Sequence, residues 1–470
     1  MNATAPGAVD ERVVSSSPQA PSDVVVDTLA VSPQEVESRA RLARAAQGAW
    51  AAAPALDRAT ALSAAADAVA AAAPELAELV GREVGKPRLE AVAEVTRTIA
   101  IMRFYAQQAL AVVGEVYPAN GPQATLLMTR QRPRGLATLV TPWNFPVMIP
   151  AWKLAPALAY GNGVLLKPAP AATACALRLA ELLSAALPSG LIQVLPGGAL
   201  TGRAAMNNAD VISFTGSTGV GKALIAQANE QGIPVQAEMG GLNASIVLPG
   251  AEPGQAAATI AAAAMGYAGQ KCTATSRVII VGDQPGFLDA LVSAVASLPG
   301  GDPGAAGTVV GPVISEPART AVLDASARAQ SEGGRTITGG GSRGPGWYVD
   351  PILVTDLQPS SWAAQNEVFG PFCVVLRVDT VDEAVEVANG TDFGLVTALF
   401  TGDLDLALQL PGRLRTGMVR VNAGTTGVDF QAPFGGTGDS GHGERELGDA
   451  TMRFYSWQQT VTMQPHGPGG

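Results

Sequence analysis

The chain has 470 residues, which is enough for two or three domains with a large hydrophobic core. Its 40 Asp and Glu against 30 Lys and Arg give a formal net charge of -10, which argues against nucleic acid as a partner because such binding needs a basic surface. Only 3 cysteines and 2 histidines occur, which argues against a disulfide framework, a histidine-rich metal site and most Ser/His/Asp arrangements, and favours a reducing, cytoplasmic location.

The N-terminal part of the chain predicts a tail followed by helices. Residues 1–27 are rich in Ser, Pro, Ala and Asp without a continuous apolar core, so we expect a flexible tail and no signal peptide. Residues 32–110 repeat Ala, Leu and Val at spacings of three and four, which is typical of helices. The most apolar run, residues 61–80, is interrupted by Asp67 and Pro74, so it predicts two helices of a soluble protein and no membrane span.

Strand and helix patterns alternate from residue 135 onwards, which is typical of parallel sheets with crossover helices. The expected strands are residues 135–141, 163–166, 192–195, 211–214, one just before Glu238, 278–281, 373–378, 398–401 and 418–421. We therefore predict two α/β domains in series. Residues 123–132 also alternate but have no partner nearby in sequence, so we expect them to leave the domain.

Cys272 is the centre of the segment Gly-Tyr-Ala-Gly-Gln-Lys-Cys-Thr-Ala-Thr-Ser-Arg at residues 266–277. An Ala-rich helical pattern precedes this segment and an apolar strand pattern follows it. A thiol on a loop of small residues can face a pocket, and thiolates are covalent catalysts when the target is a carbonyl carbon. For one cysteine taken alone, a half-buried structural thiol is the alternative interpretation.

The segment from Thr215 to Lys222 is a glycine-rich turn between a strand and a helix. Such a turn points backbone N–H groups and a helix N-terminus at an anion. Its spacing also resembles a nucleoside-triphosphate phosphate loop, but Ala223 stands where a Mg²⁺-binding Ser or Thr is needed. A diphosphate, as in a dinucleotide, needs no metal in this position.

Four further polar residues lie in tight turns or after predicted strands. Asn144 is held in the turn Pro-Trp-Asn-Phe-Pro, and Lys167 ends a strand where it could reach a ribose or phosphate or be a solvated lysine. Glu238 follows an apolar strand and is either a general base for water or a surface acid. Glu367, in Asn-Glu-Val-Phe-Gly-Pro, is ambiguous in isolation.

The order of these segments resembles the aldehyde dehydrogenase superfamily over residues 28–463. The resemblance implies an aldehyde dehydrogenase-like α/β fold, with NAD(P)-dependent oxidation of an aldehyde to a carboxylic acid by a homodimer or homotetramer. The implied parts are a Rossmann-like NAD(P)-binding domain (28–120 and 134–241), an α/β catalytic domain (242–440) and a small β oligomerisation flap (121–133 and 453–465).

The resemblance also implies catalytic roles. Cys272 matches the nucleophile that attacks the aldehyde carbon, and Asn144 with the Cys272 backbone N–H matches the pair that stabilises the oxyanion. Hydride transfer to the nicotinamide leaves a thioester, and Glu238 matches the base that activates water to hydrolyse it. Lys153 and Glu446 match a proton-relay lysine and its acidic partner.

Further matches imply contacts with the dinucleotide and no metal ion. Trp143 matches a position beside the pyrophosphate, and Phe369 matches one that packs near the nicotinamide. The other positions that match cofactor contacts are Thr141, Lys167, Gly216, Ser217, Gly221 and Glu367.

The sequence departs from the family pattern at three places. Ala169 and Pro170 stand where the family often has Ser or Ala and then a Glu that accepts both adenosine ribose hydroxyls, so we expect NADP to be tolerated or preferred. Leu242 stands where many members have lysine, a change that the sequence does not explain. In the Pro-Phe-Gly-Gly segment, Thr437 and Gly438 stand where the family usually has a basic residue that belongs to a pair.

Residues 114–118, 150–156 and 426–429 are similar to the 2-oxoglutarate semialdehyde branch of the superfamily. The apolar side chains of Met148, Ile149 and Trp152 are expected to line a substrate tunnel, with no arginine among them to pair with a distal carboxylate. The expected substrate is a small aldehyde, with 2-oxoglutarate semialdehyde as a candidate.

Two alternative functions remain. The coenzyme-A-acylating branch passes its acyl group to a thiol and lacks a hydrolytic base, so the presence of Glu238 argues against it. A non-catalytic binding or structural protein on the same fold is disfavoured by an intact set of Cys272, Asn144 and Glu238.

Overall fold

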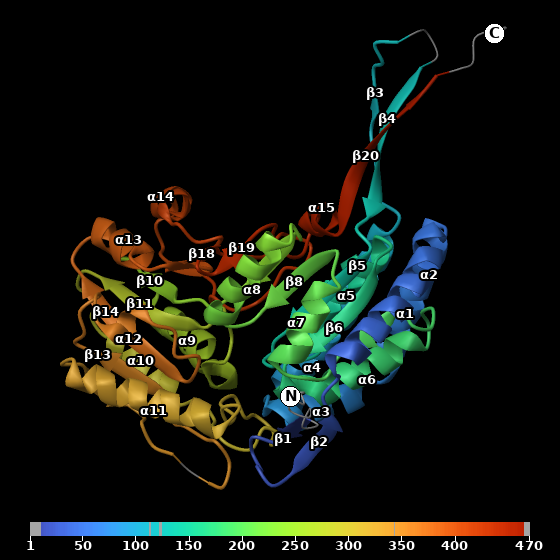
Figure 1. The fold of residues 1–470 in the computed structure, drawn as a ribbon. Coiled ribbons are helices and arrows are strands. Elements are labelled where there is room, and N and C mark those ends of the chain that lie inside the picture. Colours follow the sequence, from blue (N-terminus) through green and yellow to red (C-terminus); the bar gives the residue numbers. More distant parts are fainter. Residues whose placement is uncertain (1–10, 112–113, 122–124, 343, 465–470) are drawn as a thin grey trace, which may run out of the picture.

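The computed structural model describes residues 11–464 apart from 112, 113, 122–124 and 343. Figure 1 shows two α/β units side by side and a thin β extension that rises above them. One unit is built on a six-stranded sheet and the other on a seven-stranded sheet. This is the α/β architecture that the alternating sequence patterns predict.

The first unit is a mostly parallel sheet in the order β19-β9-β8-β5-β6-β7. Its strands are β5 (Leu136–Thr141), β6 (Gly163–Pro168), β7 (Ile192–Val194), β8 (Val211–Thr215), β9 (Val235–Glu238) and β19 (Gly441–His442). The chain runs from β5 outwards through β6 and β7, and then returns to the other side of β5 with β8 and β9. The gap between β5 and β8 is therefore a topological switch point, where open α/β sheets bind ligands.

Helices of the first unit form two kinds of layer. Those that contact its strands are α1 (Pro33–Ala52), α5 (Met148–Ala159), α6 (Thr173–Ser184), α7 (Ala199–Asn207) and α8 (Thr218–Glu230). The helices α2 (Ala55–Ala71), α3 (Ala73–Val84) and α4 (Arg88–Gln108) pack on those helices and on one another. Because α5 lies between the sheet and α4, it has no face left for solvent.

The second unit has the strand order β12-β13-β14-β11-β10-β16-β17, with only β12 antiparallel to its neighbour. Its strands are β10 (Asn243–Val247), β11 (Thr275–Val281), β12 (Arg335–Thr338), β13 (Ile352–Thr355), β14 (Phe372–Val378), β16 (Val396–Phe400) and β17 (Met418–Val421). Its longer helices are α9 (Pro253–Met265), α10 (Phe287–Ala296), α11 (Glu316–Ser331) and α13 (Val381–Asn389). The sequence patterns did not predict strands β10, β12 and β13.

The extension in Figure 1 consists of three antiparallel strands. They are β3 (Val116–Tyr117), β4 (Leu126–Pro133) and β20 (Ser456–Met463). Strands β4 and β20 pair from Leu126–Met463 to Pro133–Ser456, so the segment that was expected to leave its domain does so and finds its partner at the C-terminal end. Positions 122–124 and 465 of the predicted flap lie outside the described residues.

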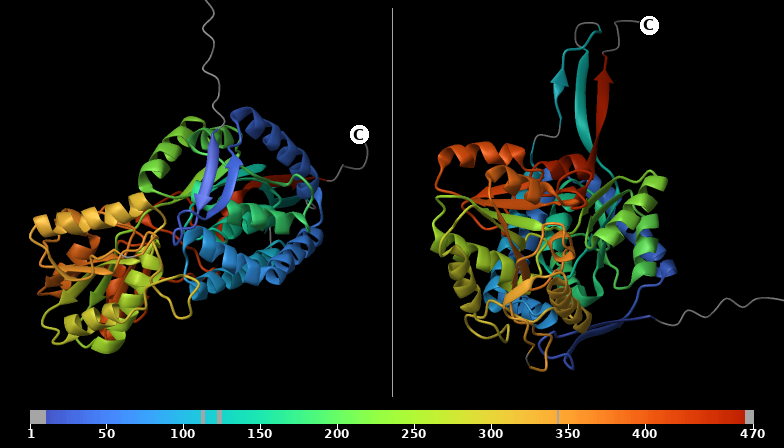
Figure 2. Two further views of the ribbon diagram at one scale, coloured as in Figure 1. Left: turned by 90° about the horizontal axis from the view of Figure 1, so that it is seen from below. Right: turned by 90° about the vertical axis from the view of Figure 1, so that its left-hand side faces the viewer.

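The prediction of a flexible N-terminal tail is wrong for the part of it that the structure describes. Strands β1 (Arg12–Ser16) and β2 (Val24–Leu29) form an antiparallel hairpin that lies against α6 (Figure 2). The hydroxyl of Ser15 donates to Glu83 at 2.8 Å, and Arg82 pairs with Asp23 at 2.7 Å. These polar contacts and the buried side chain of Val13 anchor the hairpin, so the Ser- and Asp-rich composition of the segment was misleading. Residues 1–10 lie outside the described residues.

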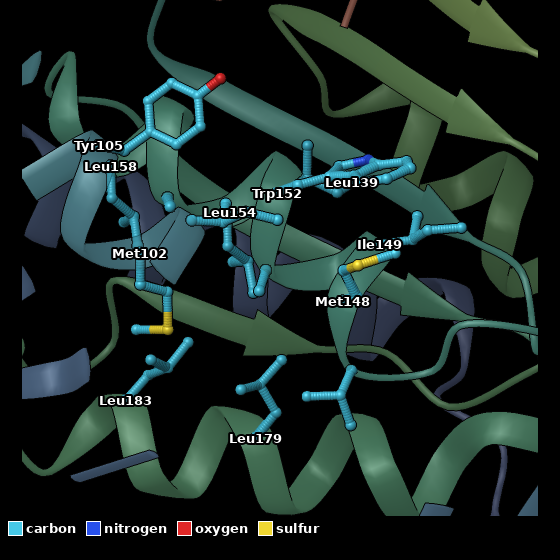
Figure 3. Packing of buried hydrophobic residues seen from close by; sticks show 14 of the residues in the cluster. Met102, Tyr105, Leu139, Met148, Ile149, Trp152, Leu154, Leu158, Leu179 and Leu183 are labelled. Carbon is cyan, nitrogen blue, oxygen red and sulfur yellow. The ribbon is translucent and has the colours of Figure 1, made fainter. Parts of the chain in front are cut away.

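Helix α5 is buried along its whole length. Figure 3 shows side chains of α5, such as Leu154 and Leu158, in one cluster with Met102 of α4 and with Leu179 and Leu183 of α6. This packing fixes the segment that follows the Pro-Trp-Asn-Phe-Pro turn. Among the described residues, no helix is both long and apolar enough to cross a membrane.

Candidate active site

A cavity of about 460 Å³ lies at the switch point of the first sheet and extends to the second unit. Both Asn144 and Cys272 line it. The predicted cofactor positions that also line it are Thr141, Trp143, Lys167, Gly216, Ser217, Glu367 and Phe369. The structure therefore brings the candidate nucleophile, the candidate oxyanion donor and seven of the eight candidate cofactor contacts together.

The segment before Cys272 is a tight 3-10 turn with unusual backbone geometry. Tyr267 and Ala268 have φ values of 54° and 52°, a left-handed conformation that is costly for residues other than glycine. Buried contacts hold this conformation, since both residues are fully buried and the Tyr267 hydroxyl donates to the Val84 carbonyl at 3.0 Å. The turn re-aims the chain from α9 so that Cys272 faces the cavity.

Hydrogen bonds hold the loop on both sides of Cys272. Before it, Asn144 Nδ2 donates to the Gln270 carbonyl at 3.0 Å, and Gln270 Oε1 accepts from the Ile314 N–H at 2.8 Å. After it, Asn243 Nδ2 donates to the carbonyls of Cys272 and Ala274, both at 2.7 Å. The Asn144 amide has a second N–H, which remains for a ligand.

The Cys272 thiol is a weak acid in this environment. Burial raises its pKa to about 12, and the negative charges of Glu367 and Glu238 add to the effect. The side chain nevertheless keeps partial solvent exposure, which an attacking nucleophile needs. Because the thiolate is the nucleophile, this thiol must transfer its proton before it can react.

Glu238 ends β9 and is buried, with 3 % of its surface exposed. Burial raises the pKa of its carboxyl well above the ordinary value, and the charge of Glu446 raises it further. Lys153 and Arg445 act in the opposite direction. Its Oε2 atom has no hydrogen-bond partner among the described residues, so this oxygen can accept a proton from water.

Lys153 and Glu446 form an ion pair that is almost fully buried. Lys153 Nζ also donates to the Ser213 hydroxyl at 2.7 Å, and that hydroxyl donates to Gln236 Oε1 at 3.0 Å. Burial lowers the pKa of Lys153, whereas the charges of Glu446 and Glu238 raise it. The group is therefore a connected set of titratable atoms next to Glu238, which is suited to move protons.

The residues at the switch point fit a dinucleotide. Thr141 and Thr215 end the neighbouring strands β5 and β8, and their buried hydroxyls have no hydrogen-bond partner among the described residues. A Cβ at Gly216 would lie 2.6 Å from the Phe214 ring, so only glycine leaves this turn in place. Helix α8 starts directly after the turn, and its N-terminus favours a diphosphate.

Gly221 does not line the cavity but supports the turn. A Cβ at this position would lie only 2.5 Å from the sulfur of Met239, so glycine leaves room for that side chain.

Glu367 comes from the second unit and accepts from the Gly241 N–H at 3.0 Å. Burial raises its pKa to about 7. Phe369, in a left-handed conformation with φ 54°, packs edge-on against Trp143 at 5.7 Å between ring centroids. Hydrogen-bond acceptors and aromatic faces therefore close the cavity from both sides.

The profile of the Aldehyde dehydrogenase family matches residues 7–461. The chain belongs to this family. Alpha-ketoglutarate semialdehyde dehydrogenase of Haloferax volcanii is 38% identical over 460 residues, which cover 95% of this chain and 94% of the relative. The predicted family, its α/β fold and NAD(P)-dependent oxidation of an aldehyde are thereby confirmed.

Solved structures of aldehyde dehydrogenases agree with this assignment. An NAD-dependent aldehyde dehydrogenase from Sinorhizobium meliloti matches with a TM-score of 0.93 and 30% identity, covering 100% of this chain and 94% of that chain. Betaine aldehyde dehydrogenase from Staphylococcus aureus, in complex with NAD+, matches with a TM-score of 0.92 and 28% identity, covering 97% of this chain and 92% of that chain.

The expected tunnel residues of this aldehyde dehydrogenase lie on α5. Met148 and Trp152 are buried in the core of the first unit, with Trp152 packed against Phe434 at 5.5 Å between ring centroids. Ile149 lines the cavity that contains Cys272. Trp152 Nε1 has no hydrogen-bond partner in the described part of the chain. A tunnel through this region stays a prediction.

Three polar residues of the aldehyde dehydrogenase site were missed at the sequence level. Gln270 and Asn243 hold the Cys272 loop, and Ser213 connects Lys153 to Gln236. Ser213 could have been found, because it is a polar residue inside the apolar strand β8. Among the described residues, no group of three or more His, Cys, Asp or Glu could hold a metal ion.

The departures from the family pattern differ in their structural setting. Ala169 and Pro170 line the cavity beside Lys167, whose pKa burial lowers to about 8. Leu242 is buried, and its carbonyl accepts from Arg277 Nη2 at 3.0 Å. Gly438 has a φ of 56°, which favours glycine at this position.

Proposed function

We propose that this aldehyde dehydrogenase oxidises a semialdehyde through a covalent adduct on Cys272 and releases the carboxylic acid by hydrolysis. The observation that carries the proposal is that Cys272 and Asn144 line one cavity with the residues that fit NAD(P). The buried carboxyl of Glu238 lies close enough for its charge to act on the Cys272 thiol. Cys272 and Asn144 line this cavity, whereas Glu238 is buried behind its lining, and this arrangement supports the assignment of nucleophile, oxyanion donor and base.

In the first step the Cys272 thiolate bonds to the aldehyde carbon, and the carbonyl oxygen becomes an oxyanion. The free N–H of the Asn144 amide and the Cys272 backbone N–H stabilise this charge without a buried cation. Bound NAD(P)+ supplies the acceptor for the hydride that leaves this carbon. The Cys272 sulfur then carries a thioester.

In the second step water attacks the thioester carbon while Glu238 takes its proton, and the carbon–sulfur bond breaks with the thiolate as leaving group. The proton on Glu238 passes to the buried group of Lys153, Glu446 and Ser213. This step requires a base, which is the reason for rejecting coenzyme-A acylation as the function. A chain with Glu238 in this place hydrolyses its thioester.

The substrate class is inferred from relatives. The curated relatives from Haloferax volcanii and Bacillus subtilis are named alpha-ketoglutarate and alpha-ketoglutaric semialdehyde dehydrogenase, at 38% and 35% identity. We assign 2-oxoglutarate semialdehyde to this chain as the first candidate. An aldehyde panel with aliphatic, aromatic and carboxylate-bearing members tests this, and a preference for the aliphatic members would contradict it.

The cofactor preference follows from position 170. Pro170 cannot accept hydrogen bonds from the adenosine ribose and does not repel a 2′-phosphate, while Lys167 beside it can attract one. We therefore expect NADP to serve as well as NAD or better.

Assembly and location complete the proposal. The strands β3, β4 and β20 form a sheet in which, among the described residues, the outer edges of β3 and β20 have no neighbouring strand. Such edges favour pairing with a second copy in a homodimer or homotetramer. The three cysteines are free thiols, and Cys272 must stay reduced, so we assign the enzyme to the cytoplasm.

Substitution of the nucleophile tests the mechanism. We expect Cys272→Ala to abolish aldehyde oxidation and to leave NAD(P)H binding, measured by fluorescence, within a few-fold of the wild type. Cys373→Ala, which removes a buried thiol from β14, is the matched control and should retain activity. Residual oxidation by Cys272→Ala above about one part in a thousand would contradict the covalent mechanism.

A further inference from the structure

The turn that carries Asn144 ends at the N-terminus of α5, and a carboxylate from another helix meets it there. Glu94 of α4 accepts hydrogen bonds at Oε1 from the N–H groups of Val147 at 2.9 Å and Met148 at 3.0 Å. We propose that Glu94, held by Lys86, is a positioning residue that fixes the Asn144 amide for oxyanion binding, an inference that rests on the proposed role of Asn144.

The N-terminus of α5 needs this acceptor. Every residue of α5 is buried, so water cannot satisfy the first N–H groups of the helix. The N-cap residue Val147 has no polar side chain and makes no side-chain cap. Glu94 replaces such a cap, and its negative charge also suits the positive end of the helix. Asn144 lies only three residues before Val147, so its position depends on this anchor.

The second oxygen of Glu94 pairs with Lys86, and both side chains are almost fully buried, at 0% and 1% exposure for Lys86 and Glu94. The ammonium group of Lys86 lies 3.7 Å from the ring centroid of Phe145 and 4.7 Å from that of Tyr267. Phe145 follows Asn144, and Tyr267 is a left-handed residue of the turn before Cys272. The ion pair therefore contacts both segments that must meet around the oxyanion.

A role in stability alone does not explain this arrangement. Apolar side chains of similar volume often replace a buried ion pair without loss of stability, because the charges lose their hydration. Here Glu94 holds the backbone that follows the Asn144 turn, and Lys86 packs on Phe145 and Tyr267, which flank Asn144 and precede Cys272 respectively. Since a displacement of about 1 Å can lower a rate about 100-fold, precise placement of the Asn144 amide is the functional gain that the geometry indicates.

The test removes the acceptor without leaving a buried charge, through Lys86→Met combined with Glu94→Leu. The measured reaction is acetylation of Cys272 by 4-nitrophenyl acetate without cofactor, in which sulfur bonds to the acyl carbon through an oxyanion and 4-nitrophenolate leaves. We expect acetylation to slow about 10- to 100-fold. Alkylation of Cys272 by iodoacetamide forms no oxyanion and should change less than about 3-fold.

Two variants give the matched comparisons. Lys86→Met combined with Glu94→Gln restores an uncharged acceptor oxygen and should recover most of the acetylation rate. Asp210→Leu removes a carboxylate that accepts from the Leu136 N–H at 2.7 Å and pairs with Arg44. Leu136 starts β5, and the Asn144 turn follows the other end of that strand. We expect this control to lose thermal stability but not the acetylation rate. Equal slowing by Asp210→Leu would overturn the proposal.

A double-mutant cycle separates this inference from the proposed role of Asn144. Asn144→Ala alone should slow acetylation about 100-fold or more. In that background, the Lys86 and Glu94 substitutions should add less than about 3-fold, because they act through Asn144. If Asn144→Ala has no effect, the role of Asn144 fails. If its effect is large and the two effects multiply, only the positioning role of Glu94 fails.

Folding of the variants does not decide the outcome. If Lys86→Met with Glu94→Leu does not fold, Glu94→Asp is the second variant. It keeps the negative charge beside Lys86 but shortens the side chain by one methylene group, which moves the acceptor oxygen away from the N–H groups of Val147 and Met148. We expect Glu94→Asp to slow acetylation about 10-fold with unchanged alkylation. Unchanged acetylation in a folded variant of either kind would overturn the positioning role.

Discussion

The Asn243 side chain donates to the carbonyl oxygen of Cys272 at 2.7 Å, and thereby fixes the peptide plane that follows the nucleophile. The same Nδ2 atom donates to Ala274, and Oδ1 accepts from the Val396 N–H at 3.2 Å. One buried side chain thus holds the Cys272 loop against two strands of the second sheet. The family resemblance named neither Asn243 nor this contact.

We predict that Asn243→Asp slows hydride transfer more than Asn243→Ser. A carboxylate cannot donate to the two carbonyls, whereas a serine hydroxyl can still satisfy one of them. Each buried carbonyl that loses its donor costs about 1–3 kcal/mol, so the melting temperature should fall as well. Single-turnover NADH formation and thermal unfolding measure the two effects. Unchanged turnover in Asn243→Asp would show that the loop is fixed without this contact.

We predict that Glu238→Gln stalls the enzyme after hydride transfer. The amide has the same shape but cannot take a proton from water, so the thioester on Cys272 accumulates. The variant should give a burst of NADH near one equivalent per site and then slow turnover, with the acyl group found on Cys272 by mass spectrometry. Glu230→Gln, at the exposed end of α8, is the control.

The outcomes for Glu238→Gln distinguish two earlier roles. If no burst appears at any pH, Glu238 is needed before hydride transfer, most simply to deprotonate the thiol. Unchanged steady-state turnover would mean that Glu238 is not the base.

We predict that Pro170→Glu shifts the cofactor preference towards NAD by about 10-fold or more in the ratio of kcat/KM values. The new carboxylate can accept from the ribose hydroxyls and repels a 2′-phosphate. Pro170→Gln, which has the same shape without the charge, separates hydrogen bonding from repulsion. An unmoved ratio in both variants would contradict the assigned role of position 170.

We predict that alkylation of Cys272 in the cofactor-free enzyme becomes about 10-fold faster per pH unit between pH 7 and 10. The reason is that its pKa of about 12 lies above this range, so the thiolate fraction is still rising. Glu367→Gln removes a negative charge that raises this pKa, and should accelerate alkylation at a given pH. Glu444→Gln, at an exposed site, is the control. A plateau below pH 9 would contradict the raised pKa.

The sequence carried much of the site because its key residues lie in short, specific segments. Asn144 and Cys272 were recognisable from five local motifs, and apolar alternation located most of the strands that bring them together. These signals depend on neighbours in sequence. The pair of Lys153 and Glu446 came from the family resemblance and not from these local signals. The structure places the two residues in contact, although 293 positions separate them.

The rest depended on contacts that composition does not reveal. The hairpin of β1 and β2 is held by Ser15 and Asp23, polar residues that in sequence look like those of a tail. Glu94 looks like an ordinary helical acid, and only the burial of α5 makes its carboxylate a cap. In each case the role of a polar side chain depends on its contact with a helix that is distant in sequence.

The pairing of β4 with β20 also sets a time order for biosynthesis. Leu126 leaves the ribosome more than three hundred residues before its partner Met463. In the part of the chain that the structure describes, the other strand beside β4 is the two-residue β3. During most of translation one edge of β4 is therefore unpaired and open to strands of other nascent chains. Premature termination before residue 456 would make that exposure permanent, so truncated products should aggregate through this strand.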